Sequence, residues 1–161
     1  MPQTTTPTWI DHSLLDEVST AAAESPRRRR NRNFHGEDTS ACHRLLNGIE
    51  PDSYIRPHRH SHPDKDESIL CIRGRLGALF FNADGTLTAT KVLDAGGPTI
   101  GVDIPHRTFH SLVALEPGTV FFEAKAGPYE PLGEDDIASW APAEGDNEAT
   151  SYHAQLAAHF E

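Results

Sequence analysis

Short apolar runs separated by turn residues dominate the chain between residues 53 and 126. Gly74 divides two of these runs, the tetrapeptide Asn-Ala-Asp-Gly at 82–85 has the composition of a hairpin turn, and Pro105 ends a later run. The strands predicted from this pattern are 68–73, 76–81, 86–93, 99–104, 109–115 and 119–126. Strands at this spacing, with no helical pattern between them, predict an antiparallel sandwich or barrel.

Helical spacing of apolar residues is confined to the two ends of the chain. Asp11 or Ser13 can cap a short helix that runs to about Glu24, and a final helix is predicted at 148–160. The apolar face of the final helix consists of Tyr152, Leu156 and Phe160. His153 lies off that face and is predicted at the surface.

The length of 161 residues is consistent with one domain that has a sizeable core. We expect residues 1–50 to form a helix and a basic connector that pack on the barrel, and residues 51–127 to form the barrel itself. Residues 128–161, which begin with a turn-rich acidic segment, are expected to form a C-terminal extension.

Three histidines alternate with other residues at positions His58, His60 and His62, and Glu67 follows them. In a β-strand alternate side chains share one face, so the three imidazoles would point the same way. Imidazole and carboxylate groups suit divalent Fe, Mn, Zn, Ni or Co. A solvated strand edge is the alternative to a metal site. Because the chain contains ten histidines, such a cluster can also arise by chance.

The spacing of these residues resembles the two motifs of the cupin superfamily. Its first motif is glycine, five residues, His-x-His, three or four residues, glutamate, six residues and glycine, and here six residues separate Glu67 from Gly74. Its second motif ends in Pro-x-Gly-x-x-His, and Pro105 and His110 keep that spacing with Arg107 in the place of glycine. The resemblance implies an all-β core, an antiparallel cupin-type barrel (double-stranded β-helix or jelly roll), with a short N-terminal helix, a C-terminal helical extension and one divalent metal ion.

Three further stretches, 25–35, 54–60 and 115–123, are similar to the WbuC family of cupin fold metalloproteins. This resemblance covers roughly residues 10–142 and implies the fold, but no particular reaction. Because WbuC-like proteins are associated with bacterial polysaccharide loci, it also implies a bacterial protein of polysaccharide biosynthesis.

Two alignments of the histidines with the cupin motif remain open. Counting back from Glu67 by the usual four-residue gap selects His60 and His62, whereas the WbuC pattern, read forward from residues 56–57, selects His58 and His60. The favoured ligand set is His58, His60, Glu67 and His110, with His62 as the alternative to His58. Three imidazoles and one carboxylate leave two positions of an octahedral ion for water or substrate.

The candidates for substrate binding are next to a predicted ligand or on its strand face: Tyr54, Arg56, His106 and Arg107. Simple surface exposure is the alternative for each of them. In one interpretation the protein is an enzyme of the isomerase or oxygenase type, whose metal ion holds a sugar or a small organic acid. In the other, the same pocket binds or senses a small molecule without turnover.

The net charge of −10 argues against nucleic acid or an anionic membrane as a partner, because both attract a basic surface. No run approaches the length of a transmembrane helix and the first residues lack the pattern of a signal peptide, so a cytoplasmic location is expected. Exposed sheet edges invite pairing and cupins commonly dimerise, so we also expect a homodimer.

The stretch Arg27-Arg28-Arg29-Arg30-Asn31-Arg32 is strongly basic and allows three interpretations. It can be a nucleic-acid arm, or a solvated connector whose charges pair with the surplus carboxylates of the chain. By resemblance to the family, it can also close with Asn33 and His35 over the barrel mouth, where guanidinium groups would bind an anionic part of the substrate. We expect no binding of duplex DNA at physiological salt.

Overall fold

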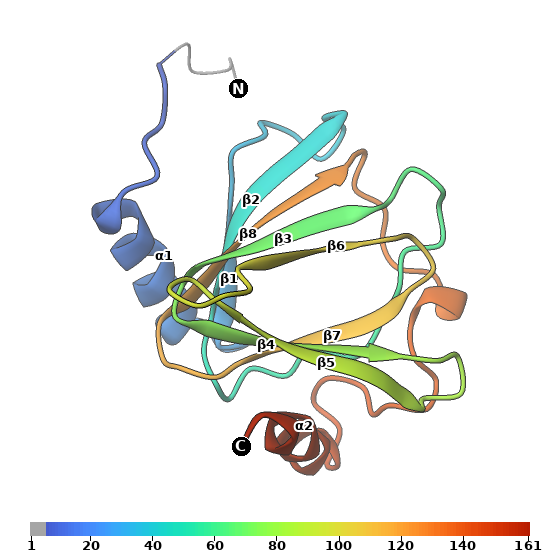
Figure 1. Ribbon diagram of the computed structural model, residues 1–161. Coiled ribbons are helices and arrows are strands. Elements are labelled where there is room, and N and C mark those ends of the chain that lie inside the picture. Colours follow the sequence, from blue (N-terminus) through green and yellow to red (C-terminus); the bar gives the residue numbers. More distant parts are fainter. Residues whose placement is uncertain (1–5) are drawn as a thin grey trace.

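Two antiparallel sheets face each other and form a barrel (Figure 1). The structure is a computed structural model and describes residues 6–161. In this part of the chain the strands are β1 (Arg29–Asn33), β2 (Cys42–Ile49), β3 (Glu67–Arg73), β4 (Arg75–Phe81), β5 (Leu87–Asp94), β6 (Gly101–Ile104), β7 (Phe109–Ala114) and β8 (Thr119–Ala126). The larger sheet has the order β1-β2-β8-β3-β6 and the smaller sheet the order β5-β4-β7. The predicted antiparallel barrel is therefore confirmed.

Alternate residues of the strands fill the space between the two sheets. This core consists of Ile49, Ile69, Cys71, Leu76, Ala78, Leu93, Ile104, Leu112, Ala114 and Phe121. Burying one large apolar side chain contributes about 1.5–3 kcal/mol, so the core determines which face of each strand points inward. Residues paired directly across two strands share a face, which means that the register also tells which polar side chains point into the barrel.

The barrel begins at β1, whereas the sequence pattern placed its start at residue 51. β1 pairs with β2 along the whole of 29–33, and β2 pairs in turn with β8. β1 contains no apolar residue and four of its five residues are exposed, because it is the outer strand of its sheet. Backbone hydrogen bonds to β2 hold such a strand, and apolar alternation does not reveal it.

Helix α1 (His12–Glu24) covers the outer face of the larger sheet (Figure 1). Asp11 caps it by accepting a hydrogen bond from the backbone N–H of Leu14, as the sequence predicted. Helix and sheet approach closely at Gly48, where a Cβ atom would lie 2.6 Å from the carbonyl oxygen of Val18. Glycine at this position of β2 therefore lets α1 lie directly on the sheet.

The C-terminal extension packs against the outer face of the smaller sheet (Figure 1). It contains η1 (Glu134–Asp136), α2 (Ala149–Ala157) and η2 (Ala158–Phe160). The ring of Phe160 lies over Gly77, only 2.5 Å from where a Cβ atom would be, and Trp140 packs on Phe81. Neither α1 nor α2 of the described residues has the length and the apolar run needed to cross a membrane.

One residue of the final helix differs from expectation. His153 is buried, with 8% of its surface exposed, and its Nε2 atom lies 2.6 Å from the carbonyl oxygen of Pro51. The helix is covered on this side as well because the chain segment that follows β2 runs past it. The prediction of a surface position considered only one apolar stripe and is therefore wrong.

Candidate metal centre

Two of the predicted ligands are held side by side by backbone pairing. His58 and His110 form an isolated antiparallel bridge, with N···O distances of 3.1 Å and 2.9 Å for its two hydrogen bonds. His110 also pairs with Phe80 of β4, so the segment around His58 extends the smaller sheet beyond β7. The ring centroids of His58 and His110 are consequently only 4.7 Å apart.

Backbone carbonyl groups orient both rings. The Nδ1 atom of His58 lies 3.0 Å from the carbonyl oxygen of Arg56, and that of His110 lies 2.9 Å from the carbonyl oxygen of Thr108. A carbonyl oxygen only accepts hydrogen bonds, so each Nδ1 carries a proton, and in the neutral ring each Nε2 keeps a free lone pair. Such an outer hydrogen bond is the usual support of a metal-binding imidazole.

The third histidine completes a cluster. His58, His60 and His110 each offer a ring nitrogen, and these three atoms all lie within 4.8 Å of one another. The backbone N–H of Arg107 donates to the carbonyl oxygen of His60 at 2.7 Å, which ties the His60 segment to the turn before β7. Residues from two distant parts of the sequence are thereby brought together.

Glu67, the first residue of β3, faces this cluster and is 4% exposed. Its Oε1 atom lies 2.7 Å from His110 Nε2 and 3.7 Å from His60 Nε2. Oε1 of Glu67 and Nε2 of His60 are nevertheless buried without a hydrogen-bond partner, because no hydrogen bond of normal geometry joins them. A carboxylate oxygen and imidazole lone pairs this close need a positive charge between them, which either a proton on His110 or a divalent cation can supply.

Burial keeps two of the imidazoles neutral. It is the main cause that lowers the pKa of His58 to about 3, and nearby His110 adds to this effect. Burial and then the positive charge of Lys125 lower the pKa of His60 to about 4. Near pH 7 both rings therefore present lone pairs and not protons.

Glu67 and His110 form a closely coupled pair. Burial opposes ionisation of Glu67, but the His110 contact and the charge of Lys125 outweigh it and lower the pKa of this carboxyl group. Burial also opposes protonation of His110, but its contact with Glu67 outweighs that and raises the pKa of the ring. A proton on His110 and a metal ion therefore compete for the same place beside the carboxylate.

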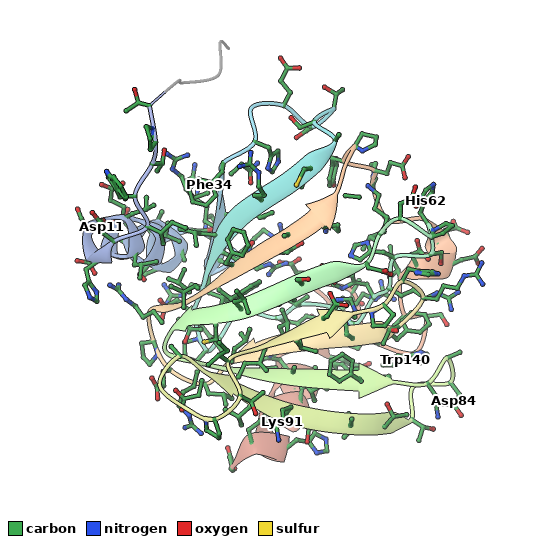
Figure 2. All side chains as sticks on the ribbon, turned by 45° about the horizontal axis from the view of Figure 1, so that its top comes forward. Asp11, Phe34, His62, Asp84, Lys91 and Trp140 are labelled. Carbon is green, nitrogen blue, oxygen red and sulfur yellow. The ribbon has the colours of Figure 1, made fainter. Side chains whose placement is uncertain are left out.

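The structure separates His62 from this cluster. Its side chain is 55% exposed, and its Nδ1 atom accepts a hydrogen bond from the backbone N–H of Asp64 at 3.2 Å. Figure 2 shows His62 at the outer edge of the loop that precedes β3. The chain turns after His60, with a hydrogen bond from Lys65 N to His62 O, so the alternation of the three histidines does not continue as a strand.

The four residues expected to bind substrate do not line the barrel cavity. The Tyr54 hydroxyl and the Arg56 guanidinium donate to backbone carbonyl groups of the C-terminal extension, at 2.8 Å and 2.9 Å. His106 pairs with the Asp66 carboxylate at 2.7 Å. Arg107 has φ 67°, so it adopts the left-handed conformation that the cupin motif gives to glycine, at a cost of about 1–2 kcal/mol. These four residues are close in sequence to the proposed ligands, but they do not lie in the cavity.

A cavity of about 490 Å³ opens beside the candidate centre and is lined by Glu67, His58 and His110 among other residues. Glu123 and Lys125 of β8 also line it, and they form an ion pair with an Nζ–Oε1 distance of 2.9 Å. The Lys125 ammonium group lies 3.8 Å from Glu67 Oε2. The sequence analysis did not select these two charges, although both fall on the inward face of a predicted strand, two residues apart.

Most of the basic stretch is engaged in ion pairs. Arg27 and Arg29 both bind the carboxylate of Glu144, at 2.7 Å and 2.9 Å, and Arg28 binds Asp52 at 3.1 Å. These contacts agree with the interpretation in which the arginines pair with surplus carboxylates. Arg27, Arg29, Arg30, Asn33 and His35 also lie among the residues that line the cavity.

Comparison with known proteins supports the fold. The family described as Domain of unknown function (DUF6016) matches residues 10–93, and no curated protein sequence matches the chain. KdgF from Halomonas sp. is 18% identical with a TM-score of 0.50, and the alignment covers 66% of this chain and 85% of KdgF. CapF in complex with the inhibitor 3-isopropenyl-tropolone is 16% identical with a TM-score of 0.54, over 70% of this chain and 32% of CapF. Another structure, of the capsular polysaccharide assembling protein CapF from Staphylococcus aureus, is 16% identical with a TM-score of 0.49, over 67% of this chain and 28% of CapF.

At these identities the likeness establishes the fold alone. KdgF and CapF are cupin-fold proteins, which agrees with the cupin-type barrel predicted from the two motifs. The narrower likeness to WbuC rests on the sequence stretches and is not confirmed by these comparisons. The chain belongs to the DUF6016 family, and its fold is that of the cupin superfamily.

Proposed function

We propose that this protein is a cupin metalloprotein that binds one divalent transition metal ion and acts on a small polar molecule in its barrel cavity. The proposed ligands are His58, His60, Glu67 and His110. The observation that carries this proposal is the pair of buried atoms without a hydrogen-bond partner, Nε2 of His60 and Oε1 of Glu67. The ring nitrogens of His58, His60 and His110 lie within 4.8 Å of one another, and Glu67 Oε1 lies 2.7 Å from His110 Nε2. Native proteins rarely leave buried polar atoms unpaired without a functional reason.

The donor set also limits the choice of ion. Neutral imidazoles with one carboxylate suit Fe, Mn, Zn, Ni or Co, and they suit Ca or Mg poorly because those ions prefer oxygen ligands. When bound, such an ion supplies a Lewis acid that polarises a substrate oxygen. The Glu67 carboxylate offsets part of the positive charge of the ion, and the carbonyl groups behind His58 and His110 hold both rings in place.

Lys125 has a place in this proposal as well. Its ammonium group lines the cavity next to Glu67 and is kept there by Glu123. A fixed positive charge beside the ligand carboxylate would stabilise negative charge that develops on a bound molecule. This arrangement favours an enzyme over a passive carrier, and the reaction class we favour is an isomerase or an oxygenase.

Elemental analysis of protein purified without a histidine tag tests the site. We expect about one equivalent of a divalent transition metal per chain in the wild type, and none in the His60→Ala variant. His106→Ala serves as the matched control because it removes another imidazole close in sequence to His110. Full metal content in both His60→Ala and His110→Ala proteins would remove the basis of the proposal.

Incubation with sugars and small organic acids then separates the enzyme from the alternative, a binding or sensing protein. Product formation that requires the metal supports the enzyme. Saturable binding without product supports the sensor. A role in bacterial polysaccharide biosynthesis, implied by the WbuC resemblance, predicts that sugars or their derivatives are among the molecules that respond.

The expected homodimer remains part of the proposal. The outer strands of the larger sheet, β1 and β6, each present one unpaired backbone edge within the described chain. Light scattering should give about twice the mass of one chain. A monomer over a wide range of concentration would contradict a dimer.

A further inference from the structure

The inner wall of the larger sheet carries a group of carboxamides across the cavity from the apolar residues of the smaller sheet. Asn31 pairs with Asn47 across β1 and β2, and Asn33 pairs with Leu45. Position 47 faces inward because it pairs with Phe121, which belongs to the core between the sheets. Directly paired residues share a face, so Asn31, Asn33 and Asn47 all point into the barrel, and all three line its cavity.

These three carboxamides have hydrogen-bonding groups to spare. Asn47 uses one N–H to donate to Glu123 at 3.2 Å, and Asn31 uses one N–H to donate to Asn33 at 3.1 Å. A carboxamide offers two donor hydrogens and an acceptor oxygen with two lone pairs. Most of these groups therefore have no partner among the described residues and face the cavity, where they can both donate to and accept from a ligand.

The guanidinium groups near the cavity are, in contrast, already bonded. Arg29 donates to Ser53 Oγ, to the carbonyl oxygen of Tyr54 and to Glu144, at distances of 3.2, 3.0 and 2.9 Å. Arg27 binds the same Glu144 carboxylate. An anionic ligand would have to break these bonds, so Arg27 and Arg29 are poor candidates for its recognition.

Arg30 points to the other side of its strand. It pairs with Gly48, and the inward neighbours of Gly48 on β2 are Asn47 and Ile49. Position 48 faces Val18 of α1 on the outer side of the sheet. Arg30 therefore starts from the outer face, although it also borders the cavity, and the hydrogen-bonding groups left free on the inner face of β1 are neutral amides.

Apolar side chains also line the cavity. Ile55 and Leu112 come from the side of the smaller sheet, next to His58 and His110, and Ile49, Ile69 and Phe121 come from the larger sheet. A ligand that fits has one edge able to donate and accept hydrogen bonds and one face covered with C–H groups. A ring or chain with adjacent hydroxyl groups has both.

We propose that the carboxamides of Asn31, Asn33 and Asn47 form a binding wall for a polyhydroxylated, carbohydrate-like ligand. The inference rests on the proposed function and narrows its substrate class, because it favours a polyol over a simple organic acid. The hydroxyl groups pair with the amides, and the C–H face packs on Ile55 and Leu112. The part of the ligand nearest Glu67 then lies beside the candidate metal centre.

Calorimetric titration and ligand-observed NMR test this wall directly. The probes are aldopentoses, aldohexoses and their alditols, with succinate and malonate as small-acid comparisons. We expect at least one polyol to bind the wild-type protein, and the Asn31→Ala/Asn33→Ala double variant to bind it about tenfold to a hundredfold more weakly. Asn147→Ala, which alters an exposed asparagine of the C-terminal extension, is the matched control and should bind as wild type does.

Three outcomes would contradict the proposed binding wall. They are no binding of any polyol, binding of the acids alone, and unchanged polyol affinity in both the double variant and the Asn47→Leu variant. Thermal unfolding and metal content of each variant show whether the fold and the candidate metal centre are intact. We expect the double variant to lose little stability because Asn31 and Asn33 are exposed on an outer strand. If the wild-type protein contains metal but binds no polyol, only this inference is contradicted. If the wild-type protein binds no metal, the proposed function is contradicted.

Discussion

The polar groups of the candidate metal centre near Glu67 and those of the arginine-rich edge near β1 differ in burial and in pairing. At the centre the groups are buried, and two of them, Oε1 of Glu67 and Nε2 of His60, lack a hydrogen-bond partner. At the edge the charges are at most partly buried, and Arg27 and Arg29 share the Glu144 carboxylate. The second arrangement pairs its charges within the protein, whereas the first holds the groups that our proposal assigns to a metal ion.

Buried polar atoms without a partner are therefore a better indicator of a functional site than a high density of charged residues. The basic stretch is the most conspicuous charge cluster of the sequence, but ion pairs account for most of it. An exposed ion pair contributes about 0–1 kcal/mol, and its loss is tolerated. A buried atom that lacks a partner costs about 1–3 kcal/mol, so its retention calls for a functional reason.

The largest expected effect is the loss of the metal from one histidine variant and not from another. His58→Ala should lower metal affinity by at least about a hundredfold because it removes a proposed ligand, and a change in an outer hydrogen bond alone costs about 10–100-fold. His62→Ala should leave the affinity close to that of wild type because the His62 side chain is 55% exposed on the loop. Chelator competition measures both. The reverse result would move the ligand set to His60, His62, Glu67 and His110.

The pH dependence of metal affinity sharpens the same contrast. His110 has a pKa above its ordinary value of 6.5, so metal must displace its proton at lower pH, and affinity should fall about tenfold per pH unit there. The fall should become steeper only near pH 4 and pH 3, the pKa values to which His60 and His58 are lowered. Chelator competition between pH 3 and pH 8 records this profile. A single steep loss near pH 6.5, as for ordinary imidazoles, would argue against the buried cluster.

A smaller effect, on the free energy of unfolding, is expected from a substitution in the arginine-rich edge. Glu144→Gln removes the shared partner of Arg27 and Arg29, but the Glu144 side chain is 38% exposed and solvent screens the pair. We expect a loss of less than about 1 kcal/mol in the free energy of unfolding, a fall of about 2–4 °C in Tm at most, and unchanged metal content. Glu130→Gln, which alters another exposed carboxylate of the same extension, is the control.

The contribution of Glu144 should also depend on pH in a defined window. The hydrogen bond from Arg27 is the main cause that lowers the pKa of Glu144 from 4.5 to about 2; burial opposes this shift and the contact with Arg29 adds to it. A lowered folded-state pKa means that the stabilisation is complete above pH 4.5 and is lost as pH falls towards 2. Thermal unfolding of wild type and Glu144→Gln should therefore differ at pH 7 and converge near pH 2. A difference that persists at pH 2 would show that charge is not its cause.

Apolar alternation predicted the strands from β3 to β8 because each of them buries one face in the core. It missed β1 and β2, which belong to the same sheet. β1 has the sequence Arg-Arg-Asn-Arg-Asn and is held by backbone pairing, which leaves no apolar signal in its side chains. For the same reason Asn31 was not recognised as a residue that lines the cavity, and Asn33 was expected only in a segment that closes over the barrel mouth.

What the sequence determined by itself is local: the strand pattern, the two helices with the Asp11 cap, and the motif spacing that relates Glu67 and His110 to a cupin barrel. The preference for His58 over His62 as a proposed ligand depends on the tertiary structure, because only the bridge between His58 and His110 shows which ring lies beside His110. Only the fold could show, too, that the substrate candidates Tyr54 and Arg56 bind the C-terminal extension, more than 80 residues away, and not the cavity. Backbone pairing and burial join residues that are distant along the chain, and no spacing within a motif contains that information.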